Sequence, residues 1–293
     1  MMTPGYDKTY FSFPRLPEAF TARYGIDGLT LRPFGQGQRD LEVDFFQAFR
    51  PYLVTDLLQC CTEMEIGKKE NTFPGAGFFW QLTVGKRLEA LLTIATREGA
   101  EDLTLQLRCL TENCGEPMEI LLSREEILGL QPPGDDTEAF AIPVNGEEFF
   151  FRKPTGQDQK EWLNANFSDE KTAVESMIEG LWIREQGVRE KQEKQLGDEW
   201  LETVNEGMKQ IDPLVHFELA VNCPACNRLS SHVLDLEDVL LRKLHKVQTG
   251  LLQAIHRLAS HYHWSERQIL AISPRRRGDY LALIESDTKG VDK

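Results

Sequence analysis

Two stretches of the sequence are built alike: LTLQLRCLTENCGEPMEILL, residues 103–122, and FELAVNCPACNRLSSHVL, residues 217–234. In each, apolar and polar residues alternate up to a pair of cysteines, and apolar residues return after it. Alternation with a period of two is typical of a strand with one buried face. Each stretch therefore predicts two strands joined by a cysteine turn.

The two cysteine turns have the spacing of half a metal site each. Cys109 and Cys114 are separated by four residues, and Cys223 and Cys226 by two, with Pro224 between them. Structural zinc takes four soft ligands in a tetrahedron, and tight turns with cysteines two to four residues apart present two thiolates to one ion. The two turns thus predict a split zinc-ribbon-like unit that holds one structural zinc. The alternative is that these cysteines are small buried apolar residues without metal.

Other ligand sets in the sequence are weaker. His216 or His232 could complete a site with Cys223 and Cys226, but neither histidine has partners at useful spacing on both sides. Cys60 and Cys61 are adjacent, and helical neighbours point about 100° apart, so both are predicted to be core residues. The remaining histidines are interpreted as partly exposed residues of a basic face: His245, His256, His261 and His263.

The sequence carries no sign of catalysis. A site closed by four thiolates leaves no position for water or substrate, so its zinc would stabilise the fold. No histidine-glutamate metal pair, glycine-rich phosphate loop or nucleophile elbow is present in the sequence. We therefore expect a non-catalytic protein.

Composition limits the number of compact units and the cellular location that we expect. A chain of 293 residues with 41% hydrophobic content can form one or two compact units. It shows neither a secretory signal nor an apolar run long enough for a membrane span, and six cysteines are too sparse for a disulfide scaffold. We expect a protein of the cytoplasm.

Charge is segregated along the chain. Residues 156–212 hold 14 acidic and 7 basic side chains, whereas residues 242–277 hold 8 basic and 1 acidic. Such asymmetry can steer binding to a charged partner, although solvated helical faces produce it as well. The net charge of −14 makes nucleic acid an unlikely partner. The candidate partner-binding residues are Arg242, Lys243, Lys246, Arg257, Arg275, Arg276 and Arg277.

The fold class predicted is α+β, in five segments. They are an N-terminal arm and small α/β cap (1–80), the first cysteine hairpin with flanking helices (81–130), a β-hairpin and helical insertion (131–212), the second cysteine hairpin (213–235) and a basic C-terminal helical segment (236–293).

Local patterns predict elements within the first three segments. The aromatic-rich first 30 residues lack periodicity and are expected to form either an arm that a partner orders or an irregular cap. The helices expected are Phe45–Cys61, interrupted by Pro51, Val84–Arg97, a short one capped by Ser123 and Glu126, and others across 157–208. Loops are expected at 67–77 and 131–136, and a hairpin at 140–151 around Asn145-Gly146. Residues 184–199 are polar throughout and fit an exposed helix or a flexible crossing.

Three helices are predicted at the C-terminal end. The first runs from about Leu236 to His261, because apolar residues recur there at steps of three and four. The second begins after Ser265, with Gln268 completing a capping box, and the third opens at Ser273-Pro274.

Several motifs together resemble the baseplate hub protein family of T-even-like contractile phage tails and related bacterial contractile injection systems. The first two are LTVGKRLEALL at 82–92 and FRKPTGQDQ at 151–159. The third joins Asp212-Pro213 to the turn at Cys223–Cys226, and the last runs from Ile255 through Trp264 to Tyr280-Leu281. The first hairpin departs from the usual two-residue spacing of its cysteines.

The resemblance implies a structural or assembly role in a baseplate, with contacts to other baseplate, spike or tube-initiator proteins and no catalysis. It also implies a place in the bacterial cytoplasm, with incorporation into an assembled tail-like particle as a further expectation. A second hypothesis from the residues alone is a zinc-ribbon nucleic-acid-binding regulator that uses the basic C-terminal helices.

Overall fold

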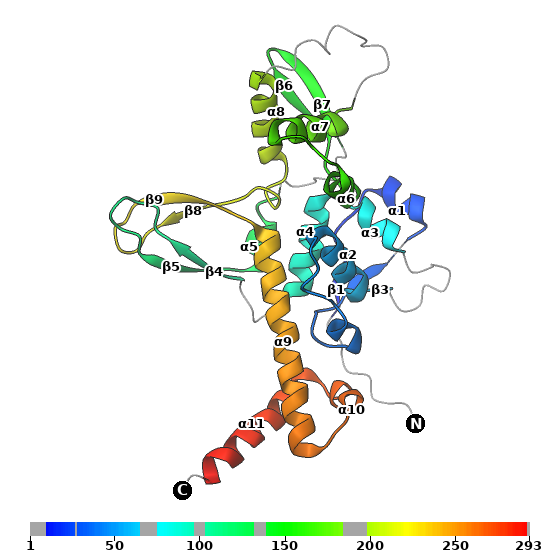
Figure 1. Cartoon of the computed structure of the whole chain (residues 1–293), viewed down its shortest axis with the longest axis vertical. Coiled ribbons are helices and arrows are strands. Elements are labelled where there is room, and N and C mark those ends of the chain that lie inside the picture. The colour runs from blue at the N-terminus through cyan, green and yellow to red at the C-terminus, as the bar shows by residue number, and fades with distance from the viewer. Residues whose placement is uncertain are drawn as a thin grey trace.

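The protein is α+β, as predicted, and elongated around one long helix (Figure 1). The computed structural model describes residues 10–26, 28–64, 75–96, 103–131, 139–183 and 198–291. In the described parts the sheets are small and antiparallel, and helices make up most of the rest. Among the described helices, none combines the length and the apolar character needed to cross a bilayer.

The largest hydrophobic core joins the N-terminal elements, both cysteine hairpins and the first half of the long helix α9 (Leu236–Tyr262). The N-terminal elements are β1 (Phe11–Ser12), α1 (Glu18–Tyr24), β2 (Leu29–Leu31), the 3-10 helix η1 (Gln38–Leu41), α2 (Arg50–Cys61), β3 (Thr62–Met64), α3 (Ala76–Gln81) and α4 (Val84–Ala95). The hairpin elements are β4 (Leu103–Arg108), β5 (Pro117–Leu122), α5 (Arg124–Leu128), β8 (Phe217–Asn222) and β9 (Leu229–Leu234). One core thus spans four of the five expected segments.

Of the two expectations for the start of the chain, residues 10–26 form the cap and not an arm that a partner orders. Phe11 is buried in the main core, and β1 and β3 flank β2 in an antiparallel sheet. The rings of Phe13, Phe20 and Tyr24 surround Phe78 of α3, with centroids 5.4 to 6.0 Å from its own. Aromatic side chains bury large areas without needing a regular spacing, so the absence of periodicity did not mean absence of packing.

The helix expected from Phe45 begins instead at Arg50. Pro51 occupies its first turn, where the missing N–H has no helical partner to lose, so the proline starts the helix and does not interrupt it. The ring of Phe45 stacks on His245 of α9 at 5.1 Å. The loop expected over 67–77 lies outside the described residues up to 74, and α3 begins within its last residues at Ala76. The turn at 132–136 and the polar stretch at 184–197 also lie outside the described residues.

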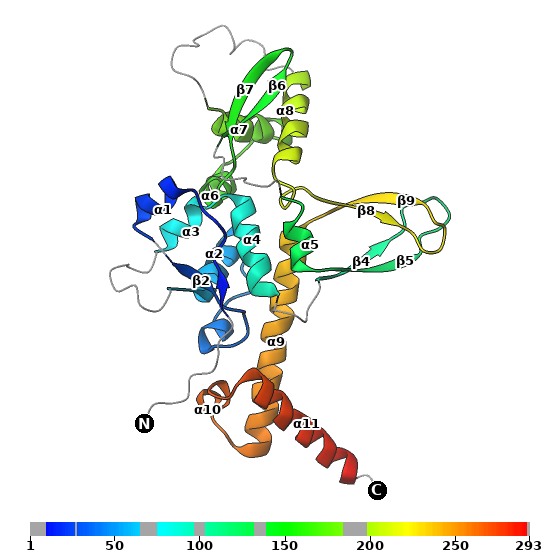
Figure 2. The ribbon, with the colours of Figure 1, turned by 180° about the vertical axis from the view of Figure 1, so that it is seen from behind.

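The insertion has a hydrophobic core of its own at one end of the molecule (Figure 2). Its elements are β6 (Ala139–Val144), β7 (Glu147–Arg152), α6 (Gly156–Asn164), α7 (Glu170–Leu181) and α8 (Asp198–Ile211). The predicted hairpin around Asn145-Gly146 is confirmed, and both turn residues have the positive φ that a tight hairpin requires. Phe149, Phe151 and Trp200 pack at its centre.

The motifs at 82–92 and 151–159 pair with each other across the base of this insertion. The N–H of Val84 donates to the carbonyl of Pro154 at 2.8 Å, and the N–H of Gly156 donates to the carbonyl of Leu82 at 3.0 Å. Between these hydrogen bonds, Thr83 and Thr155 form an isolated antiparallel β-bridge. Each of the two threonines also caps the helix that follows it. This pairing fixes the insertion on α4.

Arg87 is the buried centre of that junction. Its guanidinium donates to the carbonyls of Phe79 and Pro51 at 2.9 and 2.6 Å and to the Thr55 hydroxyl at 3.0 Å, although the side chain is only 1% exposed. Burial lowers the pKa of Arg87 to about 10. Hydrogen bonds to carbonyls of separate elements satisfy the charge and hold α2, α3 and α4 together.

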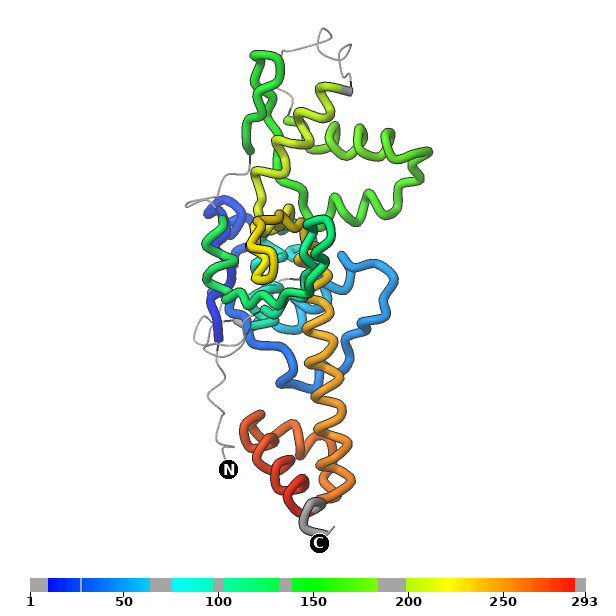
Figure 3. The backbone as a smooth tube through the Cα atoms, turned by 90° about the vertical axis from the view of Figure 1, so that its left-hand side faces the viewer, coloured from blue at the N-terminus to red at the C-terminus, as the bar shows by residue number. Residues whose placement is uncertain are grey.

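The three predicted C-terminal helices are present. Helix α9 carries the main core along its first half, and its second half packs against α10 (Glu266–Leu270) and α11 (Pro274–Val291) in a third core (Figure 3). The Ser265 and Gln268 capping box forms as predicted. Gln248 of α9 donates to the carbonyls of Asp40 and Val43, so α9 is also tied to the N-terminal part.

Gly156→Ala is predicted to destabilise the fold, because a Cβ at this position would lie 2.3 Å from Nη1 of Arg87. Displacing a guanidinium held by three acceptors is expected to cost about 1–3 kcal/mol in the free energy of unfolding, measured by urea denaturation. Gly180→Ala in α7 is the matched control, since nothing lies within 4 Å of its added Cβ. Equal stability of the two variants would contradict the role given to Arg87.

Candidate metal centre

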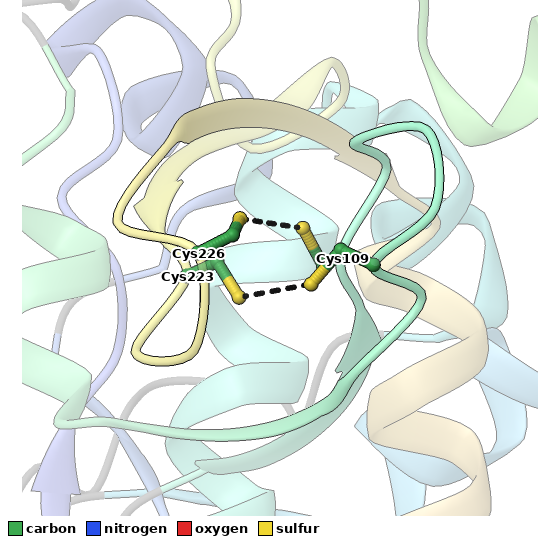
Figure 4. A group of neighbouring side chains, drawn as sticks. Cys109, Cys223 and Cys226 are labelled. Carbon is green, nitrogen blue, oxygen red and sulfur yellow. Dashed lines mark hydrogen bonds between the residues drawn. The ribbon is translucent and has the colours of Figure 1, made fainter.

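The four predicted cysteines meet at one point (Figure 4). The Sγ atoms of Cys109 and Cys226 are 3.6 Å apart, and those of Cys114 and Cys223 are 3.8 Å apart. All four sulfur atoms lie within 4.8 Å of one another. Cysteines more than 100 residues apart in the sequence are therefore neighbours in space.

Two hairpins of the same design carry these cysteines. Strands β4 and β5 pair from Leu103 opposite Leu122 to Arg108 opposite Pro117, and Cys109 follows β4 directly. Strands β8 and β9 pair from Phe217 opposite Leu234 to Asn222 opposite Leu229, and Cys223 follows β8 in the same way. The hairpins project together from one side of the molecule, and the cysteine turns lie at their joined ends (Figure 1).

Each turn is closed in the same manner. The N–H of Cys109 donates to the carbonyl of Glu116 at 2.9 Å, and the N–H of Cys223 donates to that of Arg228 at 3.0 Å. Left-handed residues make the reversals possible: Asn113 and Gly115 flank Cys114, and Asn227 follows Cys226. Asparagine and glycine tolerate this conformation at the lowest cost, so their positions in the sequence fit the turns.

Backbone N–H groups stabilise the thiolate forms. Three cysteines accept a hydrogen bond from the N–H two residues further along: Cys109 from Thr111, Cys114 from Glu116 and Cys226 from Arg228. The Arg228 N–H, with the Thr111 hydroxyl and neighbouring thiols, lowers the pKa of Cys226 to about 6. The hydroxyl and N–H of Thr111 also lower the pKa of Cys109.

The pKa of Cys114 is shifted in the opposite direction, upward. The Glu116 N–H favours its thiolate, but lost hydration and hydrogen bonds shared with the other three thiols outweigh this and raise its pKa to about 12. Four thiolates so close together repel one another, so they cannot all ionise without a cation between them.

The donor set fits a tetrahedral metal ion. Four thiolates bound to one zinc ion at about 2.3 Å would have sulfur atoms about 3.8 Å apart, close to the observed 3.6 and 3.8 Å. Cys109 and Cys223 are buried, and Cys114 and Cys226 are partly exposed, so the site lies just beneath the surface. Four protein ligands fill a tetrahedral shell, which leaves no position for a substrate.

A second group of possible ligands, Asp40, Cys60 and Cys61, does not make a metal site. Arg32 donates to both carboxylate oxygens of Asp40 at 2.6 and 2.9 Å, and three backbone N–H groups, from residues 35 to 37, share the same carboxylate. The guanidinium already supplies the positive charge, and it holds the pKa of Asp40 below its usual range despite burial. Cys60 and Cys61 are buried core residues, as predicted.

The histidines do not join the cysteines. His216 lies 3.9 Å from Glu218, and His232 is bonded to Ser230. Within the part of the chain that the structure describes, no histidine belongs to a group of three or more potential metal ligands. His256, His261 and His263 are exposed, in keeping with their interpretation as surface residues.

The seven candidate partner-binding residues are spread over two helices. Arg242, Lys243 and Lys246 line a groove beside β4, whereas Arg257 pairs with Glu285 of α11 at 3.0 Å. Arg275 and Arg276 are exposed at the start of α11. The prediction for Arg277 needs correction: this residue is only 4% exposed, so it offers almost no surface to a partner.

Sequence reasoning missed the residues that support the cysteines. Thr111 contributes both its N–H and its hydroxyl, and Asn113 and Asn227 supply the left-handed turns. In the sequence, an asparagine or glycine next to the second cysteine of each turn was the signal that could have identified these turn residues.

Comparisons of the chain with protein-family models, with curated proteins and with solved structures find no significant match.

The purified protein is predicted to hold about one metal ion per chain, identified by elemental mass spectrometry. Cys114→Ser and Cys226→Ser should each lose the ion, because a hydroxyl is a poor substitute for a thiolate ligand. Cys61→Ala is the matched control, since it removes a buried cysteine outside the cluster. Metal retained by both serine variants would show that the four thiols are not the ligands.

Proposed function

We propose that this protein is a structural or assembly component of the baseplate of a contractile phage tail-like particle or injection system. One zinc ion, held by Cys109, Cys114, Cys223 and Cys226, fixes its two cysteine hairpins as a single projecting unit. Its partners would be other baseplate, spike or tube-initiator proteins. The observation that carries the structural role is the convergence of the four thiols.

The donor set supports zinc as the metal. Four soft thiolates in a tetrahedron select zinc or an iron–sulfur centre over hard cations such as magnesium and calcium. The two sulfur pairs across the hairpins, 3.6 Å for Cys109 and Cys226 and 3.8 Å for Cys114 and Cys223, have the spacing expected around one small ion. All four sulfur atoms lie within 4.8 Å of one another, and two paired half-sites on hairpin turns are typical of structural zinc. Bound zinc would supply cross-linking of the fold, while the chain's own N–H groups favour the thiolate forms.

The baseplate assignment rests on the motif resemblance, and the arrangement of those motifs supports a structural reading of them. Gly156 of the second motif packs on Arg87 of the first. A Cβ on Gly85 would lie 1.9 Å from the Asp212 carboxylate, so the third motif also meets the first. Glycine is needed at both positions because a side chain packs directly against the backbone there, which is a requirement of folding and not of chemistry.

Removal of the metal tests the cross-linking role. A zinc chelator should raise hydrogen exchange in β4, β5, β8 and β9, since isolated two-stranded hairpins are marginally stable in water. The hairpin of β6 and β7 is the internal control, because it has no cysteines and packs on Trp200 in its own core. Unchanged protection of the cysteine hairpins after verified metal loss would contradict this role.

Affinity capture tests the assembly role. The full chain carrying a tag, expressed in cells that produce a contractile tail gene cluster, should recover baseplate, spike or tube-initiator proteins. Cys114→Ser is expected to recover less, because its hairpins are no longer fixed, while Cys61→Ala should recover as much as the natural chain. Absence of every tail protein from the natural chain's capture would overturn the assignment.

A further inference from the structure

A groove of about 690 Å³ lies between β4 and α9. Residues 103–107 of β4 line one wall, and Arg242, Lys243 and Lys246 of α9 line the other. The apolar side chains of Leu121, Leu234 and Val239 complete it. Because consecutive residues of β4 face the groove, its wall includes the edge of the strand and not only one of its faces.

That edge carries hydrogen-bonding groups that no described strand uses. Strand β4 pairs only with β5 in a two-stranded sheet of the described chain. Residues opposite each other in an antiparallel pair alternate between bonded and non-bonded positions. The N–H of Cys109 bonds to Glu116, so this pair is a bonded one. By alternation the N–H and C=O groups of Thr104 and Gln106 point outward, toward the groove.

The wall opposite that edge is positively charged. Lys246 is exposed, and the side chain of Arg242 is 68% exposed, with an ion pair to Asp238 in the preceding turn of α9. Residues four apart lie on the same helix face, so these two cations project side by side. On the sheet, the side-chain amide of Gln106 donates a hydrogen bond to the carboxylate of Glu119.

We propose that this groove binds an extended, acidic segment of a partner protein, which adds as a strand to the outer edge of β4. Its backbone pairs with Thr104 and Gln106, and alternate side chains reach the apolar residues of the groove and the cations of α9. Charge complementarity selects acidic side chains, and the unpaired edge selects an extended backbone. Binding of such a segment at this groove does not require that the protein belong to a contractile particle.

A peptide fits this groove better than a nucleic acid does. A phosphate backbone has no N–H or C=O pattern to match a strand edge, and the apolar residues Leu121, Leu234 and Val239 contribute nothing to phosphate binding. The net charge of −14 opposes a polyanion that extends beyond the groove. A short acidic strand is attracted locally by Arg242 and Lys246 without that cost.

Fluorescence anisotropy tests the proposal with a labelled octapeptide of alternating valine and glutamate and the full-length protein. Saturable binding is expected, and combined Arg242→Glu and Lys246→Glu should weaken it by about tenfold or more. Arg275→Glu with Arg276→Glu is the matched control, because it makes the same charge change on exposed residues of α11. A valine and lysine octapeptide should not bind.

Backbone pairing is tested separately. Thr104→Pro removes an outward N–H and should abolish binding, whereas Thr104→Ala keeps that N–H and should bind as before. The glutamate peptide with alternate amides N-methylated should fail to bind the natural protein, which tests pairing even where the proline variant does not fold. Equal binding of methylated and unmethylated peptides would overturn the proposal. Tighter binding of an oligothymidylate, with the same loss on reversing Arg242 and Lys246, would also overturn it.

Discussion

The fold depends on bringing four thiols from two distant hairpins to within bonding distance of one point. Cys109 and Cys226 are 117 residues apart in the chain, and their sulfur atoms lie 3.6 Å apart. Between them, the insertion that holds β6 to α8 lies outside the main core, and the chain returns to that core at Leu214. The insertion is a separate unit with its own core, anchored where the N–H of Gly156 meets the carbonyl of Leu82. The four cysteines thus lie where a long excursion of the chain returns to its starting point.

Local patterns predicted the elements that local physics determines. The cysteine hairpins and the helix from Leu236 follow from hydrophobic periodicity, and both were found close to the expected bounds. Arg32 and Arg87 were not predictable, because arginine is rarely buried and its partners here come from other elements. The start of α2 was misplaced because the partner of Phe45 also comes from another element. Phe45 fits a helical pattern, but its ring stacks on His245 of α9.

The cysteine cluster was predictable in its members and less so in its support. The spacing within each turn identified the four cysteines, because a tight turn with two cysteines can present both thiolates to one ion. The hydrogen bonds of Thr111 depend on how the two turns face each other, since its hydroxyl lies 3.8 Å from the sulfur of Cys226 in the other hairpin. Spatial clustering of the basic residues was equally beyond sequence reasoning, because Arg242 and Arg277 are both cationic and only the first is exposed.

X-ray absorption at the zinc edge of the purified protein would show whether four thiolates of this chain share one zinc ion. We expect a single shell of four sulfur ligands at about 2.3 Å. No zinc–zinc distance is expected, because one ion fills the cluster. A shell that contains nitrogen or oxygen ligands, or fewer than four sulfur atoms, would show that the four thiolates do not share one zinc ion.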